Sequence, residues 1–415
     1  MDQHSCKGIA ENSSVSRLAE PFTLLVVPST TPAAPPVELR DCLLVGTRDA
    51  IFRFGWDRTS VSKICGAVGL TSGAFYPRFA DRVDAAIALW SEWLGPVVIN
   101  ETSNLLDQLD QGDHQGFVTA MQRFAQGSPD LDVVLELILA AQFDDRLAET
   151  VGQDLREVLL ARLHSEDAAA AASRVLALVV AFGLTMSRHR SWAKNVDLTE
   201  ELNRYFIGLT QPGPVTEVPI VRADYLLNPR TVSDDPLVSA FYENGFLAIS
   251  EVGYAKANLK DICKRAGLTT GYLFARHAGK LDYFLEVIRQ GWKANFEKGV
   301  AFANEVADTY GPLVAEVVVI REFAQPEYRG QVRCNLEIHR LARFNTEAAQ
   351  MVDAQEVQLL EQVTGNREVP DTASFATAMA VGNGIFFLTS FLPGLETYDY
   401  VAPLSTLLRL KESTD

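Results

Sequence analysis

Side chains that could perform acid, base or nucleophilic chemistry are scattered along this 415-residue chain. The six histidines are dispersed, and the acidic pairs Asp144-Asp145 and Asp234-Asp235 have the character of solvated loops. No GxSxG, HExxH, phosphate-binding loop or dinucleotide fingerprint occurs. The five cysteines form no CxxC pair and have no histidine at metal-ligand spacing: Cys6, Cys42, Cys65, Cys263 and Cys334. The sequence therefore favours reduced thiols, no metal, no cofactor and a protein that is not an enzyme.

Basic side chains, by contrast, gather in two places. Residues 57–82 carry a net charge of +2 and residues 255–282 carry +4, whereas the whole chain carries −16 and the remainder therefore −22. Clustered Lys and Arg are what a phosphate backbone requires. Two basic segments in an otherwise acidic chain indicate a surface that binds nucleic acid.

Both basic segments contain the same short sequence. GLTSGAFYPRF begins at Gly69, and GLTTGYLFARH begins 198 residues later at Gly267. Across residues 61–84 and 259–282, nine of 24 positions are identical. A weaker match joins Ala181-Phe182-Gly183 to Gly382-Asn383-Gly384 at an offset of 201. An internal duplication of whole domains is the simplest interpretation.

Each copy is expected to form three short helices. An apolar helix, Leu43 to Phe54 or Leu237 to Val252, ends at a glycine where a left-handed residue is expected. Ser60 and Asn258 are suited to cap a second helix, over residues 61–68 and 259–266. Thr71 and Thr269 are suited to cap the third helix. This is the spacing of a helix-turn-helix, in which the last helix enters the DNA major groove.

The candidate DNA-contacting residues follow from that geometry. Small or polar residues at the start of the third helix allow close approach to bases, a tyrosine hydroxyl can meet a phosphate, and arginine or lysine can neutralise one. Taken singly, Gly73 could serve only helix packing, Tyr76 could be a core aromatic, and Arg78 could be merely solvated. The first copy offers Ser60, Thr71, Ser72, Gly73, Ala74, Tyr76, Pro77, Arg78 and Arg82. The second offers Lys260, Thr269, Thr270, Gly271, Tyr272, Phe274, Arg276 and Lys280.

Helical periodicity dominates the rest of the chain, and no strand pattern of comparable strength occurs, so the predicted class is all-α. Prolines concentrate in residues 1–37 and 211–236. We therefore expect a mobile arm (1–37), a first DNA-binding domain (38–84), a first effector domain (85–210), a linker (211–236), a second DNA-binding domain (237–282) and a second effector domain (283–415). No apolar run is long enough to span a membrane, which predicts a cytoplasmic protein.

The segment TSVSKICGAVGLTSGAFYPRFADR resembles the DNA-binding domain of the TetR family of bacterial transcriptional regulators, and ANLKDICKRAGLTTGYLFARHAGK is similar to a more divergent copy. The resemblance covers about 45 residues in each half. It implies an all-α subunit whose larger helical domain binds a small molecule and dimerises through a four-helix bundle. Cys65 and Cys263 stand where the family most often has alanine. Phe274 and His277, aligned with Tyr76 and Phe79, suggest that the two copies read different bases.

These expectations combine into a single-chain pseudo-dimer that represses transcription. The seam between its halves is predicted at Ser173 to Met186 and Ala376 to Ser390, closed by Leu198 to Leu209 and Tyr398 to Leu410. This seam would hold the two DNA-binding domains on the order of 34 Å apart, so that they bind the two halves of an imperfect palindromic operator. An apolar effector could bind near Phe117, Met121, Phe124 and Phe143, although these residues equally suit an ordinary helix core. The alternative is a ligand-binding or protein-interaction module that has lost DNA binding.

Overall fold

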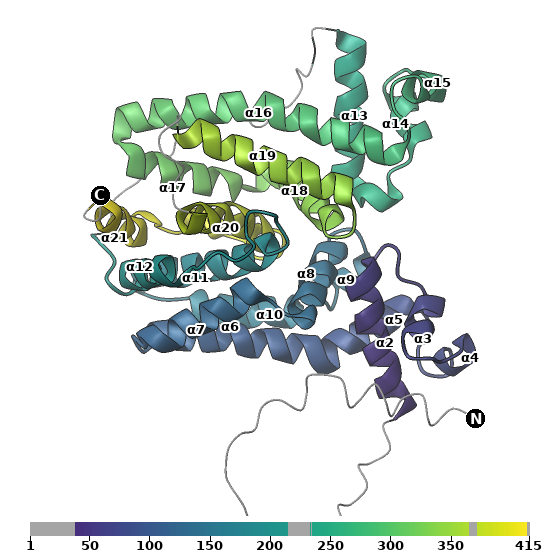
Figure 1. Ribbon diagram of the computed structural model, residues 1–415, viewed down its shortest axis with the longest axis horizontal. Helices are drawn as coiled ribbons and strands as arrows, with labels where there is room; N and C mark the ends of the chain where they lie inside the picture. The colour runs from purple at the N-terminus through teal and green to yellow at the C-terminus, as the bar shows by residue number, and fades with distance from the viewer. Residues whose placement is uncertain (1–37, 215–232, 234, 365–371, 413–415) are drawn as a thin grey trace, which may run out of the picture. The chain divides into compact units, whose positions relative to one another are not determined.

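The computed structural model describes residues 38–214, 233, 235–364 and 372–412, and in them every regular element is a helix, which confirms the all-α class (Figure 1). The predicted arm and most of the predicted linker lie outside the described residues.

The first half contains α2 (Leu39–Phe54), α3 (Val61–Ala67), α4 (Ser72–Phe75), α5 (Arg82–Leu89), the π-helix η2 (Trp90–Leu94), α6 (Gly95–Asp110), α7 (His114–Gln126), α8 (Pro129–Ala141), α9 (Asp145–Ala148), α10 (Gln153–Leu163), α11 (Ala168–Ser187) and α12 (Thr199–Thr210).

The second half contains α13 (Pro236–Lys256), α14 (Leu259–Arg265), α15 (Thr270–Phe274), α16 (Lys280–Tyr310), α17 (Pro312–Phe323), the 3-10 helix η3 (Pro326–Tyr328), α18 (Arg329–Ala342), α19 (Thr346–Thr364), α20 (Thr372–Thr389), the 3-10 helix η4 (Leu395–Thr397) and α21 (Val401–Glu412). Both halves begin with a long helix followed by two short helices, but later short elements differ, because α9 lies between α8 and α10 whereas η3 precedes α18 and η4 precedes α21. One difference is that α16 is a single long helix, whereas a π-helical turn separates α5 from α6.

The chain divides into two compact units, Met1–Leu94 and Gly95–Asp415. We call α2 to α5 the first head; it belongs to the first unit. The second head, which comprises α13 to α15 and the start of α16, belongs to the second unit together with both sets of effector helices. The boundary between the units falls at Leu94, whereas the predicted first DNA-binding domain ends at Asp84; the domain bounds stay predictions.

Local sequence explains where the helices of both heads begin and end. The Ser60 hydroxyl accepts a hydrogen bond from the Lys63 amide, and the Asn258 side chain accepts one from the Lys260 amide, so both predicted caps of the second helices are present. Gly55 (φ 74°, ψ 163°) ends α2, and Gly253 (φ 76°, ψ 163°) breaks α13. Both glycines have the predicted positive φ, but their extended ψ is not that of a left-handed helical residue.

The two longest apolar helices pack against each other in the middle of the second unit. Helices α11 and α20 lie between the α6–α7 pair and α16–α17 (Figure 1), and they contain most of the two seam segments predicted from sequence. The contact is reciprocal. A Cβ atom at Gly183 would lie 1.8 Å from the Ala380 carbonyl oxygen, and one at Gly384 would lie 1.8 Å from that of Val179. Each glycine thus faces the residue four positions before the other glycine, as expected for a contact with approximate two-fold symmetry.

The last helices of the two halves, α12 and α21, also pack together. A Cβ atom at Gly208 would meet Leu407 at 2.5 Å, and the Gly213 amide donates to the Ala402 carbonyl at 2.7 Å. Both helices lie within a few residues of the predicted bounds. Helices α11, α12, α20 and α21 therefore form one four-helix contact region between the halves, which we call the seam.

Helix α11 has the length and apolar composition of a membrane span, and it is the one helix of this kind among the described residues. In the fold, however, 89% of its most apolar window is buried by other helices. This is the pattern of a helix that is covered on all sides by other helices.

Candidate nucleic-acid interface

The turn that leads into the third helix has the same hydrogen bonds in both heads. The Leu70 amide donates to the Cys65 carbonyl at 2.8 Å, and 198 residues later the Leu268 amide donates to the Cys263 carbonyl at 2.8 Å. Gly69 (φ 68°) and Gly267 (φ 70°) both adopt the positive φ that the turn requires. Since backbone bonds and dihedral angles agree, the two similar sequences build the same turn.

The start of the next helix is also shared. The side chain of Asp84 accepts from the Ala80 amide at 3.0 Å, and that of Asp282 accepts from the Ala278 amide at 2.9 Å. The caps differ, however. Asp81 accepts from two amides at the start of α5, whereas Gly279 offers no side chain and is the weaker cap.

The third helices are short, and their leading residues are open to solvent. Thr269 accepts from the Tyr272 amide, but Thr71 makes no side-chain capping bond, so its predicted capping role is correct in position only. Thr71, Ser72 and Gly73 are exposed, as are Thr269, Thr270 and Gly271, while Ala74 and Tyr272 are half-buried. Ser60, Pro77 and Lys260 are exposed as well. A large molecule could therefore approach both helix starts.

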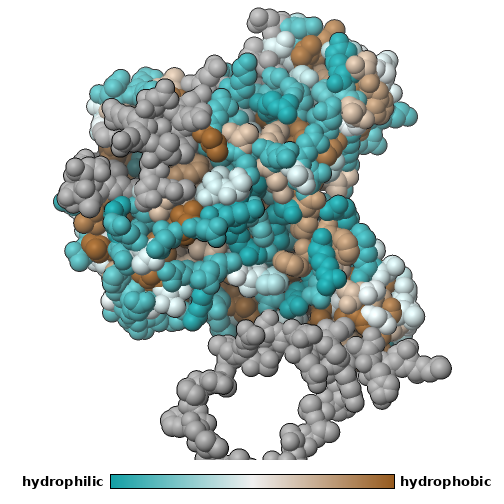
Figure 2. Space-filling model, viewed as in Figure 1, coloured by the Kyte–Doolittle hydropathy of each residue, from teal (hydrophilic) through white to brown (hydrophobic). Residues whose placement is uncertain are grey.

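One aromatic ring projects from the same position of each head. Tyr76 is 61% exposed and Phe274 is 60% exposed, values that are unusual for such large rings. Hydrophobic atoms reach the surface among hydrophilic ones around α14 and α15, at the upper right of Figure 2. The alternative that Tyr76 is a core aromatic is therefore wrong.

The arginines that follow these rings bend back onto their own helices. Arg78 Nη1 donates to the Ala74 carbonyl at 3.0 Å, and Arg276 Nη1 donates to the Tyr272 carbonyl at 3.4 Å. The Arg276 guanidinium also lies 3.6 Å from the centre of the Tyr272 ring. Both side chains are exposed and keep further N–H groups available for an anion.

Arg82 and Lys280, predicted to contact phosphate, have a structural role in addition. Arg82 Nη1 donates to the carbonyls of Trp56 (2.8 Å) and Thr59 (2.6 Å), and its guanidinium lies over the Trp56 ring. Lys280 Nζ donates to the Ala255 carbonyl at 2.9 Å and lies over the Tyr254 ring. Each cation fixes the start of the fourth helix to the end of the first. Their contact with phosphate remains a prediction.

Phe79 and His277 were expected to differ because the two heads read different bases, and this interpretation is wrong. Phe79 is 2% exposed and His277 is 7% exposed, so neither ring belongs to a reading surface. His277 packs beside Phe241 and Tyr283, and its ring nitrogens lie 3.4 Å from the Tyr242 hydroxyl and 3.5 Å from the Asp282 carboxylate. The substitution alters how the core is filled, because a buried imidazole needs polar partners.

The thiols of the two heads are buried. Cys65 and Cys263 are each 1% exposed, and burial raises the pKa of both thiols. They pack as small apolar groups, and the raised pKa favours the protonated thiol, which is a poor nucleophile.

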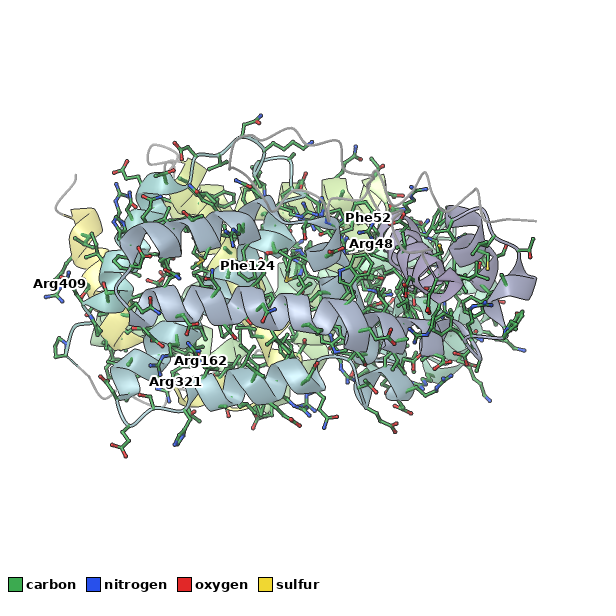
Figure 3. All side chains as sticks on the ribbon, turned by 90° about the horizontal axis from the view of Figure 1, so that it is seen from below. Arg48, Phe52, Phe124, Arg162, Arg321 and Arg409 are labelled. Carbon is green, nitrogen blue, oxygen red and sulfur yellow. The ribbon has the colours of Figure 1, made fainter. Side chains whose placement is uncertain are left out.

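The four residues predicted to line an effector site do not form one group. Phe117, Met121 and Phe124 are buried on α7, where Phe117 contacts Phe206 on α12 and Phe124 contacts Phe182 on α11. Figure 3 labels Phe124 among the packed helices, whereas Arg409 lies at the end of the bundle. Phe143 lies instead against Gly253 of the second head. These positions favour the alternative that the α7 residues form ordinary helix core.

A buried network of charges between the halves was not anticipated from the sequence. Arg340 on α18 donates through Nε to Glu136 Oε1 on α8 at 3.0 Å and through Nη1 to Glu337 Oε1 at 2.8 Å. Nearby, Asp132 on α8 lies against Arg188, His189 and Arg343. Burial would raise the pKa of Asp132, but these partners outweigh it and leave the pKa below the usual value. Glu136, Glu337 and Arg340 lie among apolar residues of helices, and nothing in this pattern indicates which charged residues pair with one another.

Within the described parts of the chain, no three His, Cys, Asp or Glu side chains are arranged to hold a metal ion. No protein-family model matches the chain, and no curated protein matches it.

Proposed function

We propose that this protein is a DNA-binding transcriptional regulator of the TetR type, in which both heads of one chain bind the two halves of one operator. The observation that carries the proposal is the repeated helix-turn-helix turn, built by the same hydrogen bonds in two basic segments with exposed leading residues. Short exposed helices of this kind enter the major groove in known regulators. Flanking arginines supply phosphate contacts.

The seam supports a pseudo-dimeric arrangement. Its reciprocal glycine contact resembles the two-fold contact of a homodimer, with both partners supplied by one chain. Because the reading residues differ between the heads, with Tyr76 opposite Phe274 and Ala74 opposite Tyr272, the operator is expected to be an imperfect palindrome. We further propose repression in the cytoplasm, relieved by an apolar effector that binds better when the heads are at the wrong separation for DNA.

Selection of bound duplexes from random DNA by the purified full-length protein tests the proposal. We expect two related but unequal half-sites about one helical turn apart. A perfectly symmetric site would contradict the asymmetric reading. Failure to bind any duplex at low salt would favour a ligand-binding or protein-interaction module.

Variants of the first head sharpen this experiment. Replacing Tyr76 by Phe together with Arg78 by Ala should weaken binding and lower the slope of log K against log salt by about one, because one phosphate contact is lost. Arg409→Ala is a matched control: Arg409 is also exposed and also bends back, donating through Nε to the Ser405 carbonyl at 3.2 Å. An equal loss of binding in both variants would mean that only overall charge matters.

A further inference from the structure

The ring of Phe143, which follows α8 in the first half, packs on the second head. A Cβ atom at Gly253 would lie 3.1 Å from Cδ2 and 3.2 Å from Cγ of Phe143. Gly253 is the point where α13 breaks and the chain turns toward α14. The positive φ favours glycine there, and any added methyl group would also press on the Phe143 ring.

Two cations attach the same stretch of the first half to the second half. Lys256 Nζ, just beyond the break, donates to the Phe143 carbonyl. Arg333 on α18 donates through Nη2 to the Gln142 carbonyl at 3.3 Å and through Nη1 to the Ser250 carbonyl at 3.2 Å. Its guanidinium lies 5.3 Å from the centre of the Phe143 ring. Gln142 and Phe143 of the first half are thus in contact with Ser250, Gly253, Lys256 and Arg333 of the second half.

A second, buried connection ends at the same turn. The Tyr254 amide donates to Glu337 Oε2 at 2.7 Å, and the other oxygen of Glu337 binds Arg340, which also binds Glu136 on α8. The exposed fractions of Glu136, Glu337 and Arg340 are 1%, 3% and 7%. At such low exposure, separating one ion pair would leave a buried charge without its partner, which is costly, so the geometry of the network is restricted.

We propose that the first-half segment Gln142–Phe143 positions the second head, and that movement of α8 is transmitted to α14 and α15 through the turn at Gly253. The chain between Gly253 and α14 is short, and Asn258 caps α14 directly. A shift of the break therefore displaces the helix-turn-helix. The expected effect on DNA binding rests on the proposed function, whereas the coupling between α8 and the turn at Gly253 does not.

The coupling is tested first without DNA, by hydrogen exchange on the full-length protein. Phe143→Ala should raise exchange in residues 253–265 roughly three- to tenfold, the range expected for residues that carry coupling energy. Phe143→Leu should restore most of the protection. Phe386→Ala is the matched control, because Phe386 is also half-buried and contacts Phe323, and both residues lie on helices outside the second head, α20 and α17.

The second measurement uses the duplex selected above, with each half-site scrambled in turn. Phe143→Ala should reduce discrimination against the scrambled second half-site roughly three- to tenfold and leave discrimination at the first unchanged. Arg333→Lys, which retains the charge but cannot bridge two carbonyls through a planar fork, should act in the same direction. Equal loss at both half-sites, or unchanged exchange in residues 253–265, would overturn the proposal. If no duplex binds, the proposed function fails, and the exchange result alone decides the coupling.

Discussion

Two glycines of helix α20 should respond in opposite ways to the same substitution. A Cβ atom at Gly384 would lie 1.8 Å from the Val179 carbonyl oxygen across the seam, whereas one at Gly382 would meet nothing within 4 Å. Gly384→Ala and Gly382→Ala thus add one methyl group to the same helix at positions two residues apart. The intrinsic helix preference changes equally in both variants.

The magnitudes follow from the contact at each site. Alanine stabilises a helix interior by up to about 1 kcal/mol relative to glycine, so Gly382→Ala should raise stability by that amount. At Gly384 the obstacle is backbone, and α11 and α20 would have to separate by roughly 1.5 Å, which forfeits a large share of the dispersion energy along the seam. Overpacking by one carbon commonly costs about 1 to 3 kcal/mol, and a rigid backbone obstacle belongs at or beyond the upper end. We expect Gly384→Ala to be about 2 kcal/mol less stable than wild type.

Thermal unfolding followed by circular dichroism measures the difference. A gap of about 3 kcal/mol between the two variants corresponds to roughly 4 to 5 °C in midpoint for a unit of about 320 residues, because the entropy of unfolding grows with chain length. Comparison of midpoints under identical conditions avoids assuming two-state unfolding of the whole chain. If Gly384→Ala were as stable as Gly382→Ala, the seam could not be packed as described, and the two-fold contact would be refuted.

Three further outcomes are expected. Arg82→Ala should lower the free energy of unfolding of the first head by about 1.5 to 3 kcal/mol, measured by thermal unfolding, because two carbonyls lose their donor. Arg82→Lys should have a smaller effect, since Lys280 has this role in the second head. In a Cys6→Ser variant, a thiol reagent at pH 8 should react only upon unfolding, because the four remaining thiols, Cys42, Cys65, Cys263 and Cys334, are buried and burial raises the pKa of the last three; rapid labelling of the native protein would contradict this. Burial and Arg190 lower the pKa of His339 to about 3. Because the unfolded state then binds the proton first, stability should be intact above pH 6.5 and fall by about 2 kcal/mol by pH 5, and His339→Gln should flatten that slope in urea titrations.

The turns and the second-helix caps of the heads could be predicted because their geometry is encoded locally. Ser60 and Asn258 lie next to the amides that they cap, and Gly69 and Gly267 satisfy a requirement for positive φ that few other residues meet. The seam segments could be found for a related reason, since long apolar helices must be buried somewhere.

The sequence does not indicate which distant residue each side chain contacts once the helices have packed. Phe79 and His277 have the aromatic character of a contact surface, and only the packing of neighbouring helices shows that they are buried. Phe143 belongs to the same residue class as Phe117, yet its partner lies more than a hundred residues away at Gly253. Likewise, nothing in the local pattern around Glu136 indicates that Arg340 will neutralise it. Such contacts depend on tertiary structure, which periodicity does not encode.

The reciprocal contact of Gly183 and Gly384 also removes a dependence on dilution. When two separate chains form such a contact, the paired fraction falls as the protein becomes scarce, because association is bimolecular. Here both surfaces belong to one polypeptide, so their association is unimolecular and its equilibrium has no concentration variable. A cell with only a few copies of the protein would have the same proportion of paired halves as a concentrated solution.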